Sequence, residues 1–333
     1  MDRTMLYDII YALAARDGRE KALFGNCAPL AHRALTHSLV GEEFPELWFE
    51  LPLAGDPWFD LHALASRAEL DGVTTFLPEE TGGYPEAFAW FAQADNVRQL
   101  ALSYDVSSGS IEHPALQLLI ARKDMSVVCD FLEAAGRADA VPTYRTFIKS
   151  LPEGWFACYT GLFPDRQQMG LRVECIPDQL LARAYAEDGV LLEEHLRRVG
   201  FSSFDDTLIE RCQELARTPF QLEFQFDVMP DGRAGTTLGA SVRFACPPGE
   251  GDWGSFLDAG ELMQKVQGWG LADGRWIQLG GTAYAQGVQF GGEKLSIYCF
   301  PAFLKLRWRD GAPLDAKAYL IAGVQHKGGE DAR

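Results

Sequence analysis

The feature that most constrains the fold of this chain is a repeated order of short strands and helices. Pairs of segments that alternate apolar and polar residues are joined by short turns, and helical segments follow the pairs. The unit recurs roughly every 50 to 60 residues. Strands joined by short turns pair antiparallel. About ten of them in series predict a closed barrel, because closure removes exposed sheet edges.

Ten runs carry the strand pattern: 46–53, 98–106, 115–124, 155–163, 169–176, 220–228, 239–246, 295–300, 303–308 and 316–323. Helices are predicted over 1–20, 55–68 (opened by Asp56-Pro57), 125–138, 179–201 and 255–269. No Pro/Ser-rich linker divides the chain. We therefore expect one domain over 1–333, with an N-terminal helical segment over 1–45 and barrel units over about 46–325. Two unrelated α+β domains that separate near 135–150 remain the alternative.

The run FQLEFQFDV indicates which face of the sheet looks inward. Leu222, Phe224 and Phe226 form one row, and Glu223 and Gln225 belong to the other. Outer helices need an apolar surface to pack against, so the polar row should point into the barrel. The same parity places further residues inside: Trp48, Glu50, Arg172, Glu174, Asp227, Ser241, Arg243, Ser296, Tyr298, Lys305, Arg307, Lys317 and Tyr319.

The last predicted hairpin, LKLRWRDGAPLDAKAYL, gathers three cations and a phenol on one side. Lys305 and Arg307 share a face of its first run, and Lys317 and Tyr319 share a face of its second. These side chains can face water, as on any half-exposed strand. They can instead line a cavity that holds an anion. The pattern alone leaves both interpretations open.

The net charge of -17 narrows the classes of partner. It argues against nucleic acid, whose phosphates need a basic surface, and against an anionic membrane. No apolar run approaches the ~20 residues of a transmembrane helix. The N-terminus has acids among its apolar residues and no basic n-region, so we expect no signal peptide. Seven singly spaced cysteines predict free thiols in a reducing cytoplasm, and we expect a cytoplasmic protein.

Three local runs and the element order carry a resemblance. ELWFELPLAGDPWFDL, FQLEFQFDVMPDGRAGTTLGASVRF and the closing AKAYL resemble strands of the ABBA aromatic and indole prenyltransferases, and the order of units resembles that family over about 45–325. The resemblance implies an α+β fold, the PT barrel. This is a ten-stranded antiparallel barrel of α-β-β-α units with helices outside. It also implies a divergent prenyltransferase that moves an isoprenyl group from an allylic diphosphate to an indole, a phenol or a peptide side chain.

The resemblance implies roles for eight residues. Glu50 would accept the proton of the acceptor, and Tyr298 and Tyr319 would shield the allylic cation. The diphosphate would be held by Arg172, Arg243, Lys305, Arg307 and Lys317. The second hairpin offers only Arg122 and Lys123, with no clear counterpart to the family's lysine. No DDxxD motif supplies a metal site, so no cofactor is expected to be required and magnesium is optional.

A non-catalytic barrel that binds a peptide or a hydrophobic small molecule is the alternative function. Glu174, Glu223 and Asp227 would repel a diphosphate unless they are paired, and their pairing with Arg172 and Arg243 would favour this alternative. The sequence has no GxGxxG, GxxxxGK[ST], GxSxG or HExxH motif, which weakens the nucleotide-binding, hydrolase and zinc-protease interpretations. The six histidines are interpreted as surface or core residues.

Overall fold

The structure is a computed structural model of the whole chain. It describes residues 2–326 apart from 37–45, 66–69, 71–74, 80, 95–96, 107–108, 121–124, 165–169, 206, 245–258, 281, 283 and 291.

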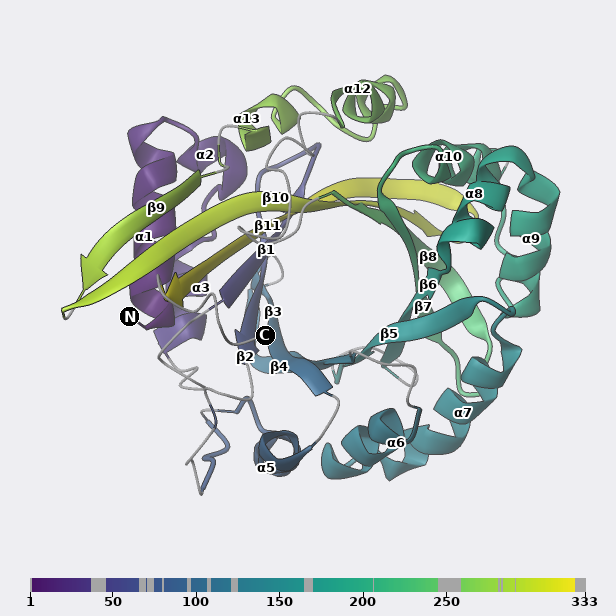
Figure 1. Cartoon of the computed structure of the whole chain (residues 1–333), viewed down its shortest axis with the longest axis horizontal. Helices are drawn as coiled ribbons and strands as arrows, with labels where there is room; N and C mark the ends of the chain where they lie inside the picture. The colour runs from purple at the N-terminus through teal and green to yellow at the C-terminus, as the bar shows by residue number, and fades with distance from the viewer. Residues whose placement is uncertain are drawn as a thin grey trace.

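The described strands form one antiparallel sheet in the order β11-β1-β2-β3-β4-β5-β6-β7-β8-β10-β9, and β10 also pairs with β11. This extra pairing closes the ring that Figure 1 shows end-on. The strands are β1 Glu46–Pro52, β2 Asp60–Ala65, β3 Val97–Asp105, β4 Ser110–Ile120, β5 Trp155–Leu162, β6 Leu171–Pro177, β7 Gln221–Val228, β8 Ala234–Arg243, β9 Tyr284–Phe290, β10 Glu293–Arg309 and β11 Ala312–His326.

Ten of the described strands make the barrel, and β9 pairs only with the first half of β10. The closing contact joins distant parts of the chain, because β1 pairs with β11 with Glu50 opposite Tyr319 and Pro52 opposite Lys317. The second half of β10 pairs with β8 on one side and β11 on the other. The predicted closed ten-stranded antiparallel barrel is confirmed.

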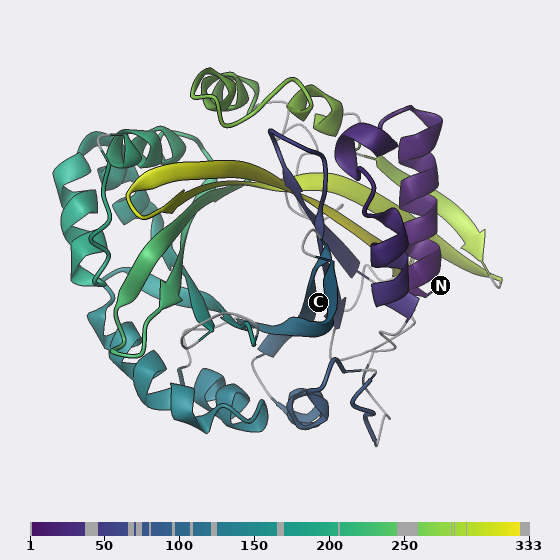
Figure 2. The ribbon, with the colours of Figure 1, turned by 180° about the vertical axis from the view of Figure 1, so that it is seen from behind.

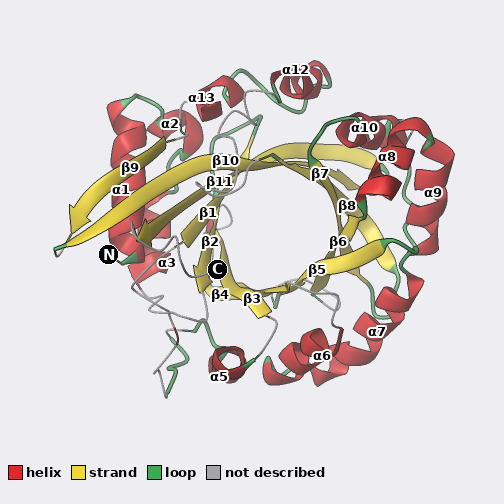
Figure 3. Cartoon of the chain, viewed as in Figure 1, coloured by secondary structure: helices red, strands yellow, loops and turns green. Residues whose placement is uncertain are grey.

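Helices surround the barrel, as Figure 3 shows in red around the yellow strands and Figure 2 shows from behind. The described helices include α1 Arg3–Arg16, α2 Glu20–Leu23, α3 Ala28–Thr36, α5 Pro85–Gln93, α6 Met125–Ala134, α7 Val141–Ser150, α8 Gln179–Glu187, α9 Gly189–Arg198, α10 Leu208–Ala216, α12 Gly260–Gly268 and α13 Trp276–Gly280. The apolar row of β7 faces them as predicted. The ring of Phe226 lies 5.8 Å from that of Phe147 on α7, and Phe224 is fully buried.

The segment predicted as a helix from Asp56-Pro57 is wrong in its central part, where the chain forms the strand β2. Asp60 and His62 alternate with Leu61 and Ala63 there, which is the period of a strand. Residues 60–64 pair with β1 on one side, and residues 61–65 pair with β3 on the other. These two ladders satisfy the backbone polar groups better than an isolated short helix would.

Two other predicted elements are divided differently in the structure. The helix predicted over 179–201 is two helices, because extended Asp188 interrupts it and its side chain accepts a hydrogen bond from the amide of Leu191. The strands predicted over 295–300 and 303–308 form the single strand β10, with a register shift between Pro301 and Phe303. The strand β9 was not predicted.

Strands on both sides of 135–150 belong to one sheet, because β4 pairs directly with β5. The sheet therefore runs without a break across the position where the alternative of two unrelated domains placed its boundary. Within the described residues, the helices are all too short or too polar to cross a membrane.

Candidate functional site

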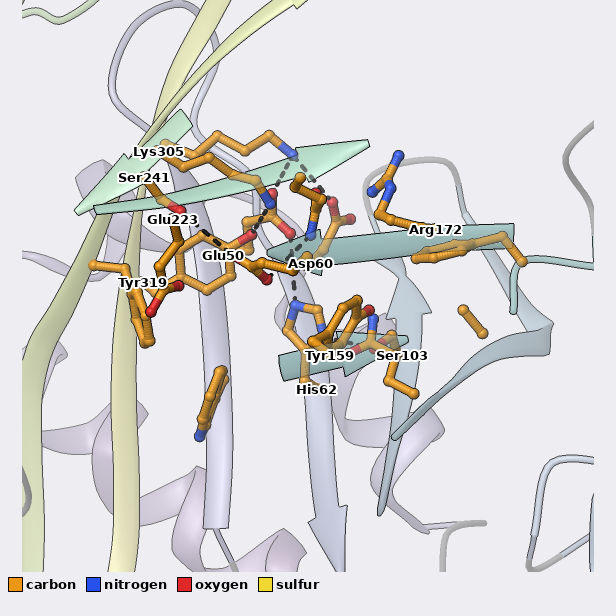
Figure 4. Close-up of a pocket in the computed structure, with 18 of the residues that line it drawn as sticks. Glu50, Asp60, His62, Ser103, Tyr159, Arg172, Glu223, Ser241, Lys305 and Tyr319 are labelled. Carbon is orange, nitrogen blue, oxygen red and sulfur yellow. Dashed lines mark hydrogen bonds and ion pairs between the residues drawn. The ribbon is translucent and has the colours of Figure 1, made fainter. Parts of the chain in front are cut away.

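The barrel encloses a cavity of about 1070 Å³. Strands around the whole ring contribute to its lining, and the side chains drawn in Figure 4 converge on it from several of them. Of the eight residues assigned roles above, seven line this cavity: Glu50, Arg172, Arg243, Lys305, Arg307, Lys317 and Tyr319. The alternation of the strands brings them together, since every second residue points inward.

Lys317 lies at the centre of a buried group of charges. Its Nζ is 3.0 Å from Glu50 Oε1 and 3.6 Å from Asp60 Oδ2, and 3% of the residue is exposed. Burial alone would raise the pKa of Glu50, but the charges of Lys317 and Lys305, together with His62, hold that pKa well below its usual value. Glu50 is therefore a buried, ionised carboxylate at neutral pH.

Lys305 and Tyr319 form a second buried pair. The ammonium of Lys305 donates to the Tyr319 hydroxyl at 2.7 Å. Burial lowers the pKa of Lys305 to about 8, although Glu50 and Glu174 oppose that shift. Burial also raises the pKa of Tyr319 well above its usual value, with further contributions from Glu50 and Glu174. Tyr319 therefore stays a neutral phenol near neutral pH.

Glu174 and Glu223 form a carboxyl pair on the neighbouring wall. Burial, followed by the negative charge of Glu174 and a hydrogen bond to it, raises the pKa of Glu223 well above its usual value. Ser241 and Gln225 also donate to Glu174, at 3.3 and 3.4 Å. The surroundings of Glu223 therefore favour its protonated form over a second negative charge beside Glu174.

The guanidinium groups differ in their partners. Arg172 forms two close contacts with Asp227, its Nε and Nη2 lying 2.8 and 2.7 Å from Oδ1. Arg307 pairs with Asp315, with Nε 2.6 Å from Oδ1. Arg243 has no ion pair among the described residues, and its buried Nε has no hydrogen-bond partner there. Of Arg172, Arg243 and Arg307, Arg243 is thus the one most available to an anion.

Four of the cavity cations lie over aromatic rings. Each charged group is 4.6–5.2 Å from the centroid of the ring beneath it. The pairs are Arg172 over Phe163, Arg243 over Phe303, Lys305 over Tyr319 and Lys317 over Trp58. The cavity wall therefore combines positive charge with π faces that attract cations.

Tyr298 does not line the cavity, in contrast to the prediction. It precedes the register shift in β10, in the half of that strand that pairs with β9. Its hydroxyl donates to Glu46 at 2.9 Å, and its ring belongs to an apolar cluster with Phe300, Phe303 and Tyr319. Ser296 is likewise outside the lining. Arg122 and Lys123 lie outside the described residues.

No protein-family model matches this chain, and no curated protein matches it in sequence. Among solved structures, the chain is similar to the crystal structure of the prenyltransferase PriB in a ternary complex with L-tryptophan and dimethylallyl thiolodiphosphate. The two share 12% sequence identity over 96% of each chain, with a TM-score of 0.48. The strand pairing of this chain itself establishes the barrel, and the side chains that line its cavity define the candidate site.

The cavity residues that escaped the sequence predictions include Asp60 and His62 on β2 and Ser103 on β3. The His62 Nδ1 and the Ser103 Oγ lie 2.5 Å apart, and the His62 Nε2 lies 3.5 Å from Glu50 Oε2. The alternation of Asp60 and His62 with apolar residues could have indicated a strand with these two side chains on one face. The helix predicted over 55–68 led to that alternation being overlooked. Among the described residues, no group of three or more His, Cys, Asp or Glu side chains is arranged to hold a metal ion.

Proposed function

We propose that this protein transfers an isoprenyl group from an allylic diphosphate to an electron-rich acceptor inside the barrel. The observation that carries the proposal is the cation wall, which we define as Arg172, Arg243, Lys305 and Lys317. Each of its charged groups lies 4.6–5.2 Å from the centroid of an aromatic ring, and all four line one cavity. Cations and aromatic faces in one enclosed space suit the two charges that ionisation of the donor creates.

Ionisation leaves a diphosphate anion and an allylic cation. Preorganised ammonium and guanidinium groups stabilise the developing charge on the diphosphate oxygens. Arg307 would add to the positive potential from its place beside Asp315, and the rings of Tyr319 and Phe303 would attract the carbocation. Glu50 would supply the negative charge that favours loss of the acceptor's proton.

The volume of about 1070 Å³ suits both substrates at once, because small-molecule sites commonly measure ~300–1,000 Å³. An indole or phenol acceptor fits the aromatic lining. A side chain presented by a peptide would meet the same groups. The acceptor's reacting atom must lie beside the donor's allylic carbon, since proximity within one enclosure supplies much of the rate gain.

A non-catalytic binding barrel remains the second candidate, favoured by the pairing of Arg172 with Asp227 and of Lys317 with Glu50. Such pairs reduce the net positive charge offered to a diphosphate. A barrel of this kind would bind an uncharged prenyl alcohol as tightly as the corresponding diphosphate. Affinity for the diphosphate itself therefore separates the two candidates.

Calorimetry with dimethylallyl S-thiolodiphosphate, with and without magnesium, tests the proposal. The wild type should bind, and Arg243→Gln should weaken binding tenfold or more, because hydrogen bonds to charged groups contribute ~1.5–3 kcal/mol. Arg233→Gln, at an exposed arginine in the turn between β7 and β8, is the matched control and should bind as the wild type does. Dimethylallyl alcohol should bind far more weakly. Equal affinity for the alcohol and the diphosphate would favour the binding barrel, and no binding of either would overturn the transferase.

A further inference from the structure

Three polar side chains lie in series across three adjacent strands of the barrel. Glu50 is on β1, His62 on β2 and Ser103 on β3, and all three line the cavity. His62 and Ser103 are direct partners in the β2–β3 register. Each of the three residues is 8–9% exposed. Figure 4 shows His62 between the other two.

The contacts along this series have a direction. The Ser103 Oγ lies 2.5 Å from His62 Nδ1, which is hydrogen-bonding distance. The His62 Nε2 is buried, has no hydrogen-bond partner among the described residues, and lies 3.5 Å from Glu50 Oε2. In ligand-free enzymes such catalytic contacts are often long and shorten when the substrate binds. A hydrogen bond that served only to join β2 to β3 would require Ser103 and His62, but it would not require the carboxylate of Glu50 beside the imidazole.

Glu50 is poorly placed to take a proton directly from a ligand. Lys317 occupies its Oε1 at 3.0 Å, and His62 faces its Oε2. A carboxylate held in its ionised form by neighbouring cations is a weak base, since proton transfer to it gains little free energy. The same carboxylate is well suited to stabilise a positive imidazolium beside it.

We propose that Ser103, His62 and Glu50 form a proton relay in which the Ser103 hydroxyl meets the acceptor. This inference rests on the proposed prenyl transfer. As the new bond to the isoprenyl carbon forms, the acceptor's proton moves to Ser103 Oγ while the hydroxyl proton moves to His62 Nδ1. The electron pair of the broken bond stays on the acceptor and restores its neutral form. The resulting imidazolium faces Glu50 and later returns its proton to solvent.

The relay requires one tautomer of His62, with its proton on Nε2 facing Glu50 and a bare Nδ1 that accepts from Ser103. Nitrogen-15 NMR of the full-length protein tests this without any turnover, with the His62 signals assigned by comparison with His62→Gln. The Nδ1 signal should show an unprotonated nitrogen and should shift in Ser103→Ala. A proton on Nδ1 would overturn the relay, because Ser103 would then accept a hydrogen bond and could not deliver its proton.

Single-turnover kinetics with saturating donor test the relay in action. Ser103→Ala and His62→Gln should each slow transfer about 10²- to 10⁴-fold, the usual contribution of general base catalysis, while calorimetric donor affinity changes less than about twofold. The double variant should be no slower than His62→Gln, because groups that act as one unit are not additive. Imidazole should restore part of the transfer by His62→Gly.

Ser150→Ala is the matched control, since Ser150 ends α7 outside the cavity lining and its hydroxyl donates to the carbonyl of Phe147. It should transfer at the wild-type rate. Additive losses in the double variant, or donor affinity that falls together with the rate, would overturn the relay. A wild type that binds no diphosphate would instead overturn the proposed function, and the tautomer of His62 would still decide whether the relay exists.

Discussion

At the scale of single residues, charges of both signs share the interior of this barrel. Lys317 is bound to Glu50 and lies near Asp60, and Arg172 is bound to Asp227. Removing one member of a buried pair leaves its partner charged and unsolvated, which costs far more than the pair itself contributes. Variants at these positions therefore change stability as well as ligand binding.

Lys317→Met should lower the free energy of unfolding by about 3–5 kcal/mol at pH 7, because it leaves Glu50 without the ammonium that neutralises it. Urea denaturation followed by circular dichroism measures the change. The double variant Lys317→Met with Glu50→Gln should recover part of the loss. A single variant as stable as the wild type would show that the pair is dispensable. Variants of Lys317 therefore test the proposed diphosphate site only where their folded fraction has been measured.

The lowered pKa of Lys305 predicts how the free energy of unfolding changes with pH. Its pKa in the folded protein is about 8, against a usual 10.5, so between these values the unfolded chain binds more protons than the folded one. Stability contributed by Lys305 therefore rises as pH increases through this window. Relative to Lys305→Met, the wild type should gain up to roughly 3 kcal/mol between pH 8 and pH 10.5. Urea titrations across this range measure the difference, and a flat difference would show that Lys305 titrates normally.

At the scale of elements, strand alternation predicted which way most cavity residues point, but not what they meet. Parity places Lys317 and Glu50 on inward faces. Their contact depends on the register of β1 against β11, which are far apart in the sequence. The site on β2 was missed because Asp56-Pro57 is a local helix signal, whereas β2 is specified by neighbouring strands. Tyr298 lies on the inward face that parity predicts, packed with Phe303 and Tyr319, but its hydroxyl is bound to Glu46 outside the cavity lining, a contact that alternation cannot reveal.

The pairing of β10 with β11 depends on a glycine. Gly323 lies opposite Tyr298, and a Cβ on Gly323 would come within 2.2 Å of the Tyr298 hydroxyl. Gly323→Ala should therefore destabilise the protein by about 1–3 kcal/mol, the usual cost of overpacking. Thermal unfolding measures the loss. Adding Tyr298→Leu should restore most of it, and if it does not, the strain lies in the backbone and not in the tyrosine.

At the scale of the whole molecule, the ring makes each half of the chain depend on the other. A fragment ending at residue 150 would contain β1 without β11 and β4 without β5, so two strand edges would lack their partners. Such a fragment, 1–150, should not give the dispersed NMR spectrum of a folded protein. Coexpression with 151–333 should restore it. A well-folded 1–150 on its own would mean that the ring is not required for the stability of its first half.

Under the proposed prenyl transfer, the cation wall has a consequence for the order in which the substrates bind. Before ligand binds, the π faces of Trp58, Phe163 and Phe303 are covered by the protein's own ammonium and guanidinium groups. A diphosphate that draws those groups toward its oxygens would leave the rings bare on the side where the aromatic acceptor must stack. The acceptor's site would then be created by the donor. Initial-rate kinetics would show a compulsory sequence, donor first, with the acceptor binding only to the protein that already holds it.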